Sequence, residues 1–318
     1  NSIIWHNTRI DGTVDAWAHH KAGAYSNVEG QTNQDWCEEC INEDPLFYNW
    51  QDMDFNIPAN SRCVNDGIPD SLDVDGTPFD IGLYPHLNDY TGPGYYVDPA
   101  SGNDSTGTGS MGSPFYSIQS AVNFALDPGD YIEIPPGEYI GNIFIENRSP
   151  DIYSTGGWSE TILDGDSTGS VLTFINVDSS ASLSGFTVRN GSSWYNGYHT
   201  RGGGIYLKDA DLLLTDLLIE DNTAINEGGG IYATYSDAVL DRSIVFNNFS
   251  SSEGGGIRAE NSSLTVHKSL VVGNTSVGSG AGIASPFGAL TAVNSIIWHN
   301  TRIDGTVDAW DHDKAGSY

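Results

Sequence analysis

Hydrophobic and polar residues recur with a period of 26 residues in the second half of the chain. A glycine motif, GGGI or GAGI, ends four times in an isoleucine, and a later asparagine keeps the same spacing. The two columns consist of Ile205, Ile231, Ile257 and Ile283 and of Asn222, Asn248, Asn274 and Asn300. A third column is apolar and consists of Leu212, Ala238, Leu264 and Leu290. A fixed period of this length indicates a solenoid of stacked structural repeats.

The local pattern within each period predicts strands and not helices. Segments such as LLLTDLLIEDN and SIVFNN are short, rich in aliphatic residues and interrupted by asparagine. Coils built from such strands stack in parallel register about 4.8 Å apart, so that like residues lie over like. We therefore predict a right-handed parallel β-helix in which the isoleucines share one buried row.

Two residue types are expected to shape the turns of each coil. The asparagine column predicts a ladder of side-chain amides at a buried turn, each bonding the next. The glycines at 202–204 and their equivalents are expected to supply turns with positive φ. Asn190 precedes Asn222 by 32 residues, and the stretch SSWYNGYHT between them accounts for the excess as an inserted loop.

A second repeat exists on a larger scale. Residues 1–25 and 294–318 lie 293 positions apart, and three differences among 25 positions leave 22 identical. The differences are Ala18/Asp311, His20/Asp313 and Ala24/Ser317. The near-identity predicts a tandem module of 293 residues, of which this chain would be an excerpt that begins inside one β-helix and ends inside the next.

The ends of a module can be placed by their departure from the coil pattern. Residues 117–126 form the best helix candidate, because four apolar residues share one face, and such a helix would cap the first coil. Strands are predicted at 131–134, 139–146, 161–163, 171–177 and 183–188. The irregular, aromatic segment 44–84 is expected to close a solenoid. We therefore divide the chain into the end of one module (1–85), a linker (86–94) and the start of the next module (95–318).

Charge narrows the range of partners. The net charge is −30, from 12 basic and 42 acidic residues, so nucleic acid and anionic membrane surfaces are not expected as partners. The sequence has no run of 18 apolar residues, so we also expect no membrane insertion. Divalent cations would relieve the repulsion within so acidic a surface.

Clustered carboxylates make calcium the best candidate ligand. Five aspartates lie between residues 65 and 80: Asp66, Asp70, Asp73, Asp75 and Asp80. Asp98 and Asp104 form a second cluster in DPASGND. Closely spaced oxygen ligands suit a structural Ca²⁺ ion, although the spacing is not that of an EF-hand. The alternative is that these carboxylates shape turns by bonding the backbone, without an ion.

The cysteines are too few for a disulfide scaffold. They are Cys37, Cys40 and Cys63. CEEC resembles neither a redox motif nor a zinc motif, because no second CxxC accompanies it. We expect one structural disulfide that joins Cys63 to either Cys37 or Cys40.

Several motifs carry a family resemblance. The opening YVD…GND…SP…SIQSAV, the IPPGEY strand and the GGGI coils resemble secreted bacterial right-handed β-helix proteins related to pectate lyases. The ending DPLF…DF…SRCV…DVDGTPFDIGLY resembles the C-terminal signature of their anchored surface members. The resemblance covers nearly the whole module. It implies the fold and an extracellular or cell-surface location, and it leaves the activity open, because the fold hosts lyases, hydrolases, adhesins and stalks.

The catalytic groups typical of these enzymes are not found. The resemblance would lead us to expect calcium with an Arg or Lys base in a lyase, or clustered aspartates with His in a glycosidase, and we assign no catalytic residue. Arg242 and Lys268 share one column beside His267, which could be a basic patch for an acidic glycan or an ordinary strand exterior.

Two functions fit these observations. The tandem repeat favours a structural module of an extracellular filament, fibre or surface stalk, whose partners are identical modules joined head to tail. The alternative is a carbohydrate-binding or polysaccharide-degrading protein with a groove along one face of the β-helix.

Overall fold

The computed structural model describes residues 1–7, 23–29, 37–38, 40–69, 71–193 and 200–311. The chain divides into two compact units, Asn1–Phe124 and Ala125–Tyr318. The boundary predicted from the sequence lies elsewhere, at 86–94, and it stays a prediction about how successive modules are joined. Each unit is described by itself below.

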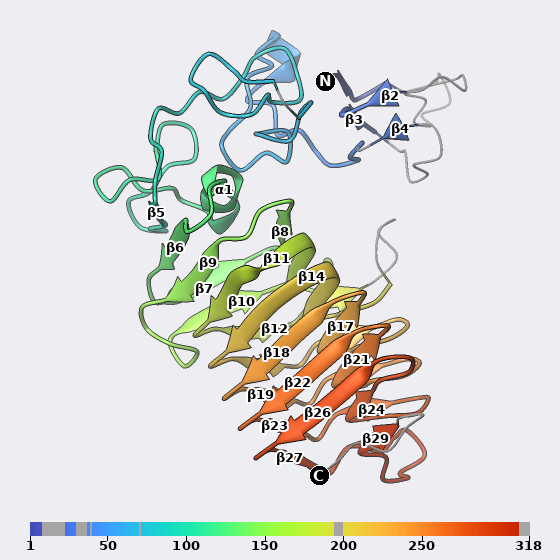
Figure 1. Ribbon diagram of the computed structural model, residues 1–318. Coiled ribbons are helices and arrows are strands. Elements are labelled where there is room, and N and C mark those ends of the chain that lie inside the picture. Colours follow the sequence, from blue (N-terminus) through green and yellow to red (C-terminus); the bar gives the residue numbers. More distant parts are fainter. Residues whose placement is uncertain (8–22, 30–36, 39, 70, 194–199, 312–318) are drawn as a thin grey trace. The chain divides into compact units, whose positions relative to one another are not determined.

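The second unit is a right-handed parallel β-helix. Strands follow one another in chain order from the green β6 to the red β27 of Figure 1, and they pair in parallel. Its strands are β6 (Tyr131–Ile134), β7 (Gly137–Ile140), β8 (Ile143–Glu146), β9 (Asp151–Ser154), β10 (Thr161–Asp164), β11 (Leu172–Ser184), β12 (Thr187–Arg189), β13 (Ser192–Ser193), β14 (Ile205–Thr215), β15 (Leu218–Glu220), β16 (Thr223–Ala224), β17 (Ile231–Thr234), β18 (Asp237–Asp241), β19 (Ile244–Phe246), β20 (Phe249–Ser250), β21 (Ile257–Glu260), β22 (Ser263–His267), β23 (Leu270–Val272), β24 (Thr275–Ser276), β25 (Ile283–Ala284), β26 (Ala289–Val293), β27 (Ile296–Trp298), β28 (Thr301–Arg302) and β29 (Trp310–Asp311).

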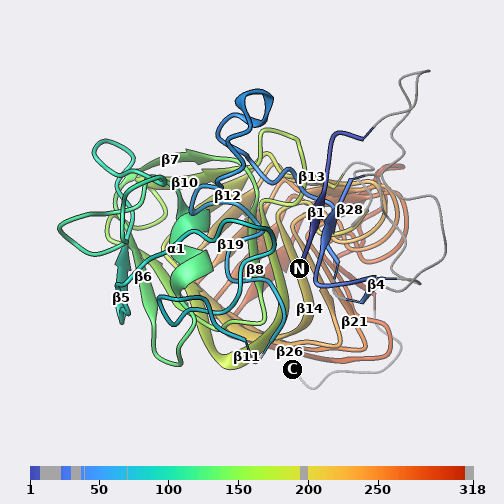
Figure 2. The same ribbon diagram turned by 90° about the horizontal axis from the view of Figure 1, so that it is seen from above.

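Three parallel sheets line the sides of this unit. One sheet has the order β27-β23-β19-β15-β12-β10-β7, and a second has the order β13-β16-β20-β24-β28. The third contains β29-β25-β21-β17-β14-β11-β9-β6, with β8, β18, β22 and β26 attached. In the turned view of Figure 2 the coils largely overlap, as stacked coils do when they are seen close to their common axis. One coil therefore contributes strands to all three sheets, and coils such as the one with β17, β18, β19 and β20 contribute two strands to the third.

Like residues stack in the core because the coils share one register. Ile205 pairs with Ile231, Ile231 with Ile257, and Ile257 with Ile283. These four side chains are at most 1% exposed, so the isoleucine row is buried as predicted. The apolar column from Leu212 to Leu290 pairs in the same way and is at most 6% exposed.

The coils turn at corners with left-handed backbone. Two corner columns carry no glycine, and φ lies between 46° and 58° in both: Asp209, Tyr235, Asn261 and Phe287, and Asp216, Arg242, Lys268 and Asn294. In the glycine motif only the first residue of each trio, such as Gly202, has positive φ. The prediction that whole trios supply positive φ is thus wrong. The third glycine provides room, because a Cβ on Gly204 would lie 2.6 Å from the Gly230 carbonyl oxygen.

The first unit contains few regular elements. These are β1 (Ile3–Ile4), β2 (Gly23–Ala24), β3 (Asn27–Val28), β4 (Cys37–Glu38), a 3-10 helix (Trp50–Asp52), β5 (Gly94–Tyr96) and α1 (Ile118–Phe124). The predicted helix is present and slightly shorter than the expected range 117–126. Its Asn123 side chain donates to the carbonyl oxygens of Ala59 and Ser61 at 2.7 and 2.9 Å, which ties α1 to the irregular segment.

The predicted strands before residue 190 are largely present. The range 131–134 is β6, whereas 139–146 is broken into β7 and β8 at Gly141, where φ is 127°. β11 is longer than expected and continues to Ser184, before a second positive-φ glycine, Gly185. Glycines with positive φ thus end these strands at positions that the sequence pattern did not predict.

Candidate functional site

The asparagine column runs along one corner of the second unit. Asn222 donates from Nδ2 to Asn248 Oδ1 at 3.0 Å, and the two following pairs in the column are joined at 2.9 Å. Each oxygen also accepts the backbone amide of the asparagine before it, at 2.9–3.1 Å. All four side chains are at most 1% exposed, so these bonds lie in a dry environment.

Every amide in this column has a second partner in the preceding coil. Nδ2 of each asparagine donates to a strand carbonyl at 2.8–3.0 Å, and the acceptors are Val188, Ile219, Val245 and Val271. A coil shifted by one residue would lose all of these bonds at once. Such a shift is costly, because each buried amide would be left unpaired. The column therefore fixes the register between coils.

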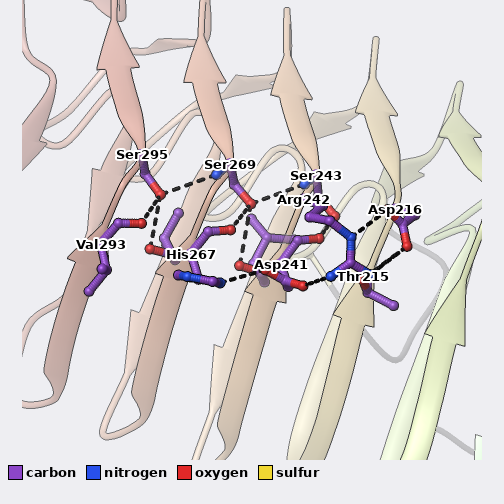
Figure 3. Close-up of polar contacts among 11 residues, drawn as sticks. Thr215, Asp216, Asp241, Arg242, Ser243, His267, Ser269, Val293 and Ser295 are labelled. Carbon is purple, nitrogen blue, oxygen red and sulfur yellow. Dashed lines mark hydrogen bonds and ion pairs between the residues drawn. The ribbon is translucent and has the colours of Figure 1, made fainter.

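Two columns of serines also fix the register between coils, and they were not predicted from the sequence. Ser243 N donates to Ser269 Oγ at 3.0 Å, and Ser269 N donates to Ser295 Oγ at 3.2 Å (Figure 3). Each hydroxyl donates in turn to the carbonyl two residues earlier, as Ser269 does to His267 at 2.8 Å. A second column links Ser236 to Ser262 at 3.0 Å. The signal was present, because these serines also recur every 26 residues.

The charged side chains beside the serines bind one another. Arg242 donates to both oxygens of Asp216 at 2.9 and 2.7 Å and to Thr215 Oγ1 at 2.7 Å, and it also contacts Asp241 (Figure 3). Nδ1 of His267 lies 2.6 Å from Asp241 Oδ1. The hydrogen bond from Arg242 holds the pKa of Asp216 below its usual value of 3.8. Two of the three basic residues predicted here, Arg242 and His267, are thus each paired with an aspartate of the preceding coil.

A second ionic cluster lies near the glycine corners. Arg201 Nε lies 2.8 Å from Glu227 Oε2, and its guanidinium carbon lies 5.2 Å from the centre of the Tyr232 ring. Tyr232 donates to Glu260 Oε2 at 2.6 Å, and Arg258 binds Glu253 at 2.6 Å. Burial raises the pKa of Tyr232. These carboxylates hold arginine and tyrosine partners, and the cluster ties neighbouring corners together.

The predicted calcium cluster in the first unit binds backbone amides. Asp75 accepts from Asn88 N at 2.6 Å and from Thr77, while Asp73 accepts from Asp80 N at 3.0 Å. Asp80 accepts from Asn65 and His86 amides at 2.7 and 2.6 Å. Burial raises the pKa of Asp80 to about 7 even though these hydrogen bonds lower it. Asp66 lies 4.0 Å from Arg62, and Asp70 lies outside the described residues.

The second predicted cluster also serves the backbone. Asp104 accepts from the amides of Tyr116 and Ser117 at 2.9 and 3.0 Å, just before α1. Asp98 accepts from Ala100 N at 2.8 Å. Within the described part of the chain, no group of three or more His, Cys, Asp or Glu side chains is arranged to hold a metal. Calcium binding stays a prediction, and the described carboxylates act as turn acceptors.

The disulfide prediction is wrong for Cys63. This thiol is fully buried and unbridged, and Asn27 Nδ2 donates to it at 3.2 Å. Burial raises its pKa to about 12, so it stays protonated. Cys40 is disulfide-bonded, and the side chain of Cys37 lies outside the described residues. The packing of Cys63 against Asn27 and Ser61 leaves its sulfur in the core of the first unit.

Comparisons with known proteins give short or distant matches. The Chlamydia polymorphic membrane protein repeat matches residues 216–234, which include the β15 corner of one coil. No curated protein matches the chain. The pectin methylesterase from Aspergillus niger is 11% identical, with 72% of this chain and 83% of that chain covered and a TM-score of 0.43. Escherichia coli ybhc is 15% identical, with 70% and 69% covered and a TM-score of 0.34.

The geometry describes a stack held together by repetition. Buried columns of isoleucine, asparagine and serine run across successive coils. Charged side chains at the surface, such as Arg242 and Asp216, also pair from one coil to the next. The described residues contain no helix with the length and hydrophobicity needed to cross a bilayer. The chain is a parallel β-helix repeat protein.

Proposed function

We propose that the chain is a structural module of an extracellular filament, fibre or surface stalk that assembles head to tail. The observation that carries the proposal is the recurrence of one 25-residue segment at an offset of 293 residues, with 22 identical positions. In both copies this segment contains a strand near its start, β1 in one and β27 in the other. A contact between different surfaces of identical units, when it does not close into a ring, generates a filament.

The internal bonding of the coils supports a mechanical role. Each coil binds the next through main-chain ladders and through side chains of the same type, so adding a coil repeats contacts already made. Solenoids gain stability from such contacts between neighbouring repeats. Arg242 and Arg201 each form an ion pair with a carboxylate, which favours a structural role for these arginines over a catalytic one.

An extracellular or cell-surface setting fits three features. The disulfide at Cys40 is a bond that persists in oxidising surroundings. The charge of −30 keeps an exposed surface hydrated. The matched repeat is described for polymorphic membrane proteins of Chlamydia, which supports a place at a cell envelope.

Electron microscopy and light scattering of the purified chain over a range of concentrations test this function. We expect elongated particles that lengthen with concentration and show one axial repeat per module. Compact particles of monomer mass at every concentration would contradict the proposal. Release of reducing or unsaturated sugars from acidic polysaccharides would replace it with the enzymatic alternative.

A further inference from the structure

One sheet of the second unit has an apolar outer surface. Its strands β15, β19 and β23 are each three residues long, and the middle residue of each is buried in the core, so the first and third residues face outward. Phe246 and Leu270 are the most exposed of these outward residues, at 42% and 37%. Five of the six outward residues are apolar and are called the apolar patch below: Leu218, Ile244, Phe246, Leu270 and Val272.

The apolar patch is continuous across three coils. Ile244 pairs with Leu218 of the preceding coil, and Phe246 pairs with Val272 of the following one. A Cβ on Gly273 would lie 3.2 Å from the Phe246 ring, so the ring leans over the corner of the next coil. Each of the three strands is paired on both edges, and the patch therefore lies within the stack of coils and not at one of its ends.

Charged residues border the patch on the same sheet. The outward positions in line with Glu220 carry Arg189 on β12 and Asp164 on β10. Arg189 binds Asp164 at 2.9 Å and Glu138 of β7 at 2.7 Å. Glu220 is the only charged residue among the outward positions of β15, β19 and β23. An uncharged apolar surface in a chain with a net charge of −30 marks a place where another molecule binds.

Another pair of exposed apolar residues forms no comparable surface. Leu213 of β14 and Val239 of β18 are 40% and 39% exposed. Asp211 and Asp237 lie two residues before them on the same face, and Asp237 N donates to Asp211 at 2.7 Å. Thr265 follows Val239 in the next coil. Polar groups therefore interrupt this face, which makes it a suitable control.

The corner before the apolar patch carries charges in a definite order. Asp216, Arg242 and Lys268 precede β15, β19 and β23 and share left-handed backbone, with φ between 46° and 53°. Arg242 binds both Asp216 and Asp241 (Figure 3). The exposed Lys268 side chain forms no ion pair with the described part of the chain. Along this corner the charge changes from negative beside β15 to positive beside β23.

We propose that two copies of this chain pair side by side through the apolar patch, with their coil axes antiparallel and a two-fold axis over β19. In this arrangement β15 of one copy faces β23 of the other, while Ile244 and Phe246 meet their own counterparts. The two copies use the same surface, as a two-fold interface requires. The contact is lateral, so it goes beyond the head-to-tail assembly proposed above and does not depend on it.

The charge order is the reason why a second copy fits. Reversal of one copy places Lys268 of each chain opposite Asp216 of the other, so opposite charges meet twice. A parallel pair would instead bring Asp216 of one copy to Asp221 of the other, which repel. Negative charge opposes contact between copies elsewhere on the surface, whereas contact at the patch removes apolar side chains from water.

A substitution at the centre of the patch tests the contact. Phe246→Gln should raise the dissociation constant of the pair about tenfold or more, because the side chain meets its own counterpart at the two-fold axis. Sedimentation equilibrium measures this constant. Val239→Gln is the matched control, since its side chain is similarly exposed on the interrupted face, and it should leave the constant unchanged. Circular dichroism of both variants confirms that the coils remain folded.

A charge swap tests the antiparallel arrangement. Lys268→Glu places two carboxylates opposite each other, so it should weaken pairing about tenfold at low salt. Asp216→Lys added to Lys268→Glu reverses the whole column, and pairing should return to within about threefold of the parent. The left-handed corner accepts lysine, as Lys268 itself shows. A double variant that pairs no better than Lys268→Glu alone would overturn the arrangement.

Spin labels measure the direction of the coil axes. β7 lies four strands before β19 in the sheet, and Ile140 of β7 is 73% exposed. Labels on Ile140→Cys should lie about 38 Å apart along the axis in the antiparallel pair, which is eight spacings of about 4.8 Å. A parallel pair would place them at the same height and much closer together. The parent chain treated with the same label gives the background from its own cysteines.

The outcomes separate lateral pairing from the filament. Monomers at every concentration, or equal dissociation constants for the parent and Phe246→Gln, would overturn the pairing. Filaments one coil stack wide in electron micrographs of the parent would also overturn it and would leave the head-to-tail function intact. Paired particles that never lengthen would support lateral pairing and contradict the filament.

Discussion

The two units satisfy their buried polar groups in different ways. In the coils of the second unit an amide finds its acceptor in the equivalent residue of the next coil, as Asn248 does in Asn274. In the first unit the acceptors are single carboxylates, and Asp75 serves both Asn88 and Thr77. In the repeated coils one type of hydrogen bond therefore recurs many times, whereas in the irregular segment each turn has its own acceptor.

This difference explains where the acidic clusters lie. Asp73, Asp75, Asp80 and Asp104 accept the backbone amides of turns in the irregular first unit. Charged acceptors make stronger hydrogen bonds than neutral ones, so they hold loops that strand pairing does not. The contrast predicts that variants in the coils act on many equivalent contacts, while variants in the first unit act on one turn.

The largest effect is expected from the isoleucine row. Ile231→Ala removes a side chain that is 1% exposed between two other isoleucines, and it should lower the free energy of unfolding of the coils by about 4 kcal/mol. Urea unfolding followed by far-ultraviolet circular dichroism measures it. Ile140→Ala is the control, because that side chain is 73% exposed and should change little. Equal losses in the two variants would argue against a shared buried row.

The asparagine column comes next. Asn248→Ala removes the oxygen that accepts from Asn222 N and Nδ2 and the amide that donates to Ile219, and the expected loss is about 3 kcal/mol. Urea unfolding of the coils gives the value. Asn226→Ala is the matched control, since Asn226 is exposed and bonds only at the surface. A stability within 0.5 kcal/mol of the parent, the typical scatter of roughly neutral surface changes, would mean that the column does not hold the coils.

In the first unit, Asp75→Ala should weaken one turn. Loss of the acceptor for Asn88 and Thr77 is expected to cost about 2 kcal/mol. Cys63 reports on it, because a buried thiol with a pKa of about 12 reacts with a thiol reagent only after local opening. Labelling should be faster in the variant than in the parent or in the exposed control Asp89→Ala.

The same labelling experiment, repeated with calcium and with a chelator, tests whether Asp75 binds an ion. If Asp75 acts as a turn acceptor alone, the difference in labelling rate should be the same with calcium and with a chelator. A difference that appears only with calcium would instead assign the cluster to a bound ion.

The smallest effect is expected at the surface ion pair. Asp216→Asn keeps the shape and the left-handed backbone but weakens the bond to Arg242, and the melting temperature should fall slightly at low salt and not at high salt. The pKa of Asp216 is lowered in the folded state, so its contribution is present above pH 3.8 and is lost as the pH falls through the lowered pKa. A difference that survives at high salt or strong acid would contradict this account.

Repetition decided how much of the fold could be predicted from the sequence. A residue at a 26-residue period must meet its equivalents once coils stack, so the isoleucine row and the pairing of coils followed from spacing alone. The helix at α1 followed from its apolar face. Ser243, Ser269 and Ser295 have the same period, but serine is so common in this chain that their spacing stands out less than that of the isoleucines.

The remaining features depend on contacts that no period marks. Cys63 was expected to pair, yet its thiol packs against Asn27, which is distant in sequence. The acidic loops suggested an ion because carboxylates suit both calcium and backbone amides, and sequence does not tell which one is bound. The glycine trio was read as one conformation, whereas Gly202 turns the chain and Gly204 makes room for a neighbouring carbonyl.

Diffraction from aligned assemblies tests the central claim most directly, because coils that stack along a filament place their strands across its axis. The account predicts a reflection at about 4.8 Å along the filament axis, together with a longer axial repeat from each module. A reflection at about 4.8 Å at right angles to the axis, or no assemblies to align, would contradict it.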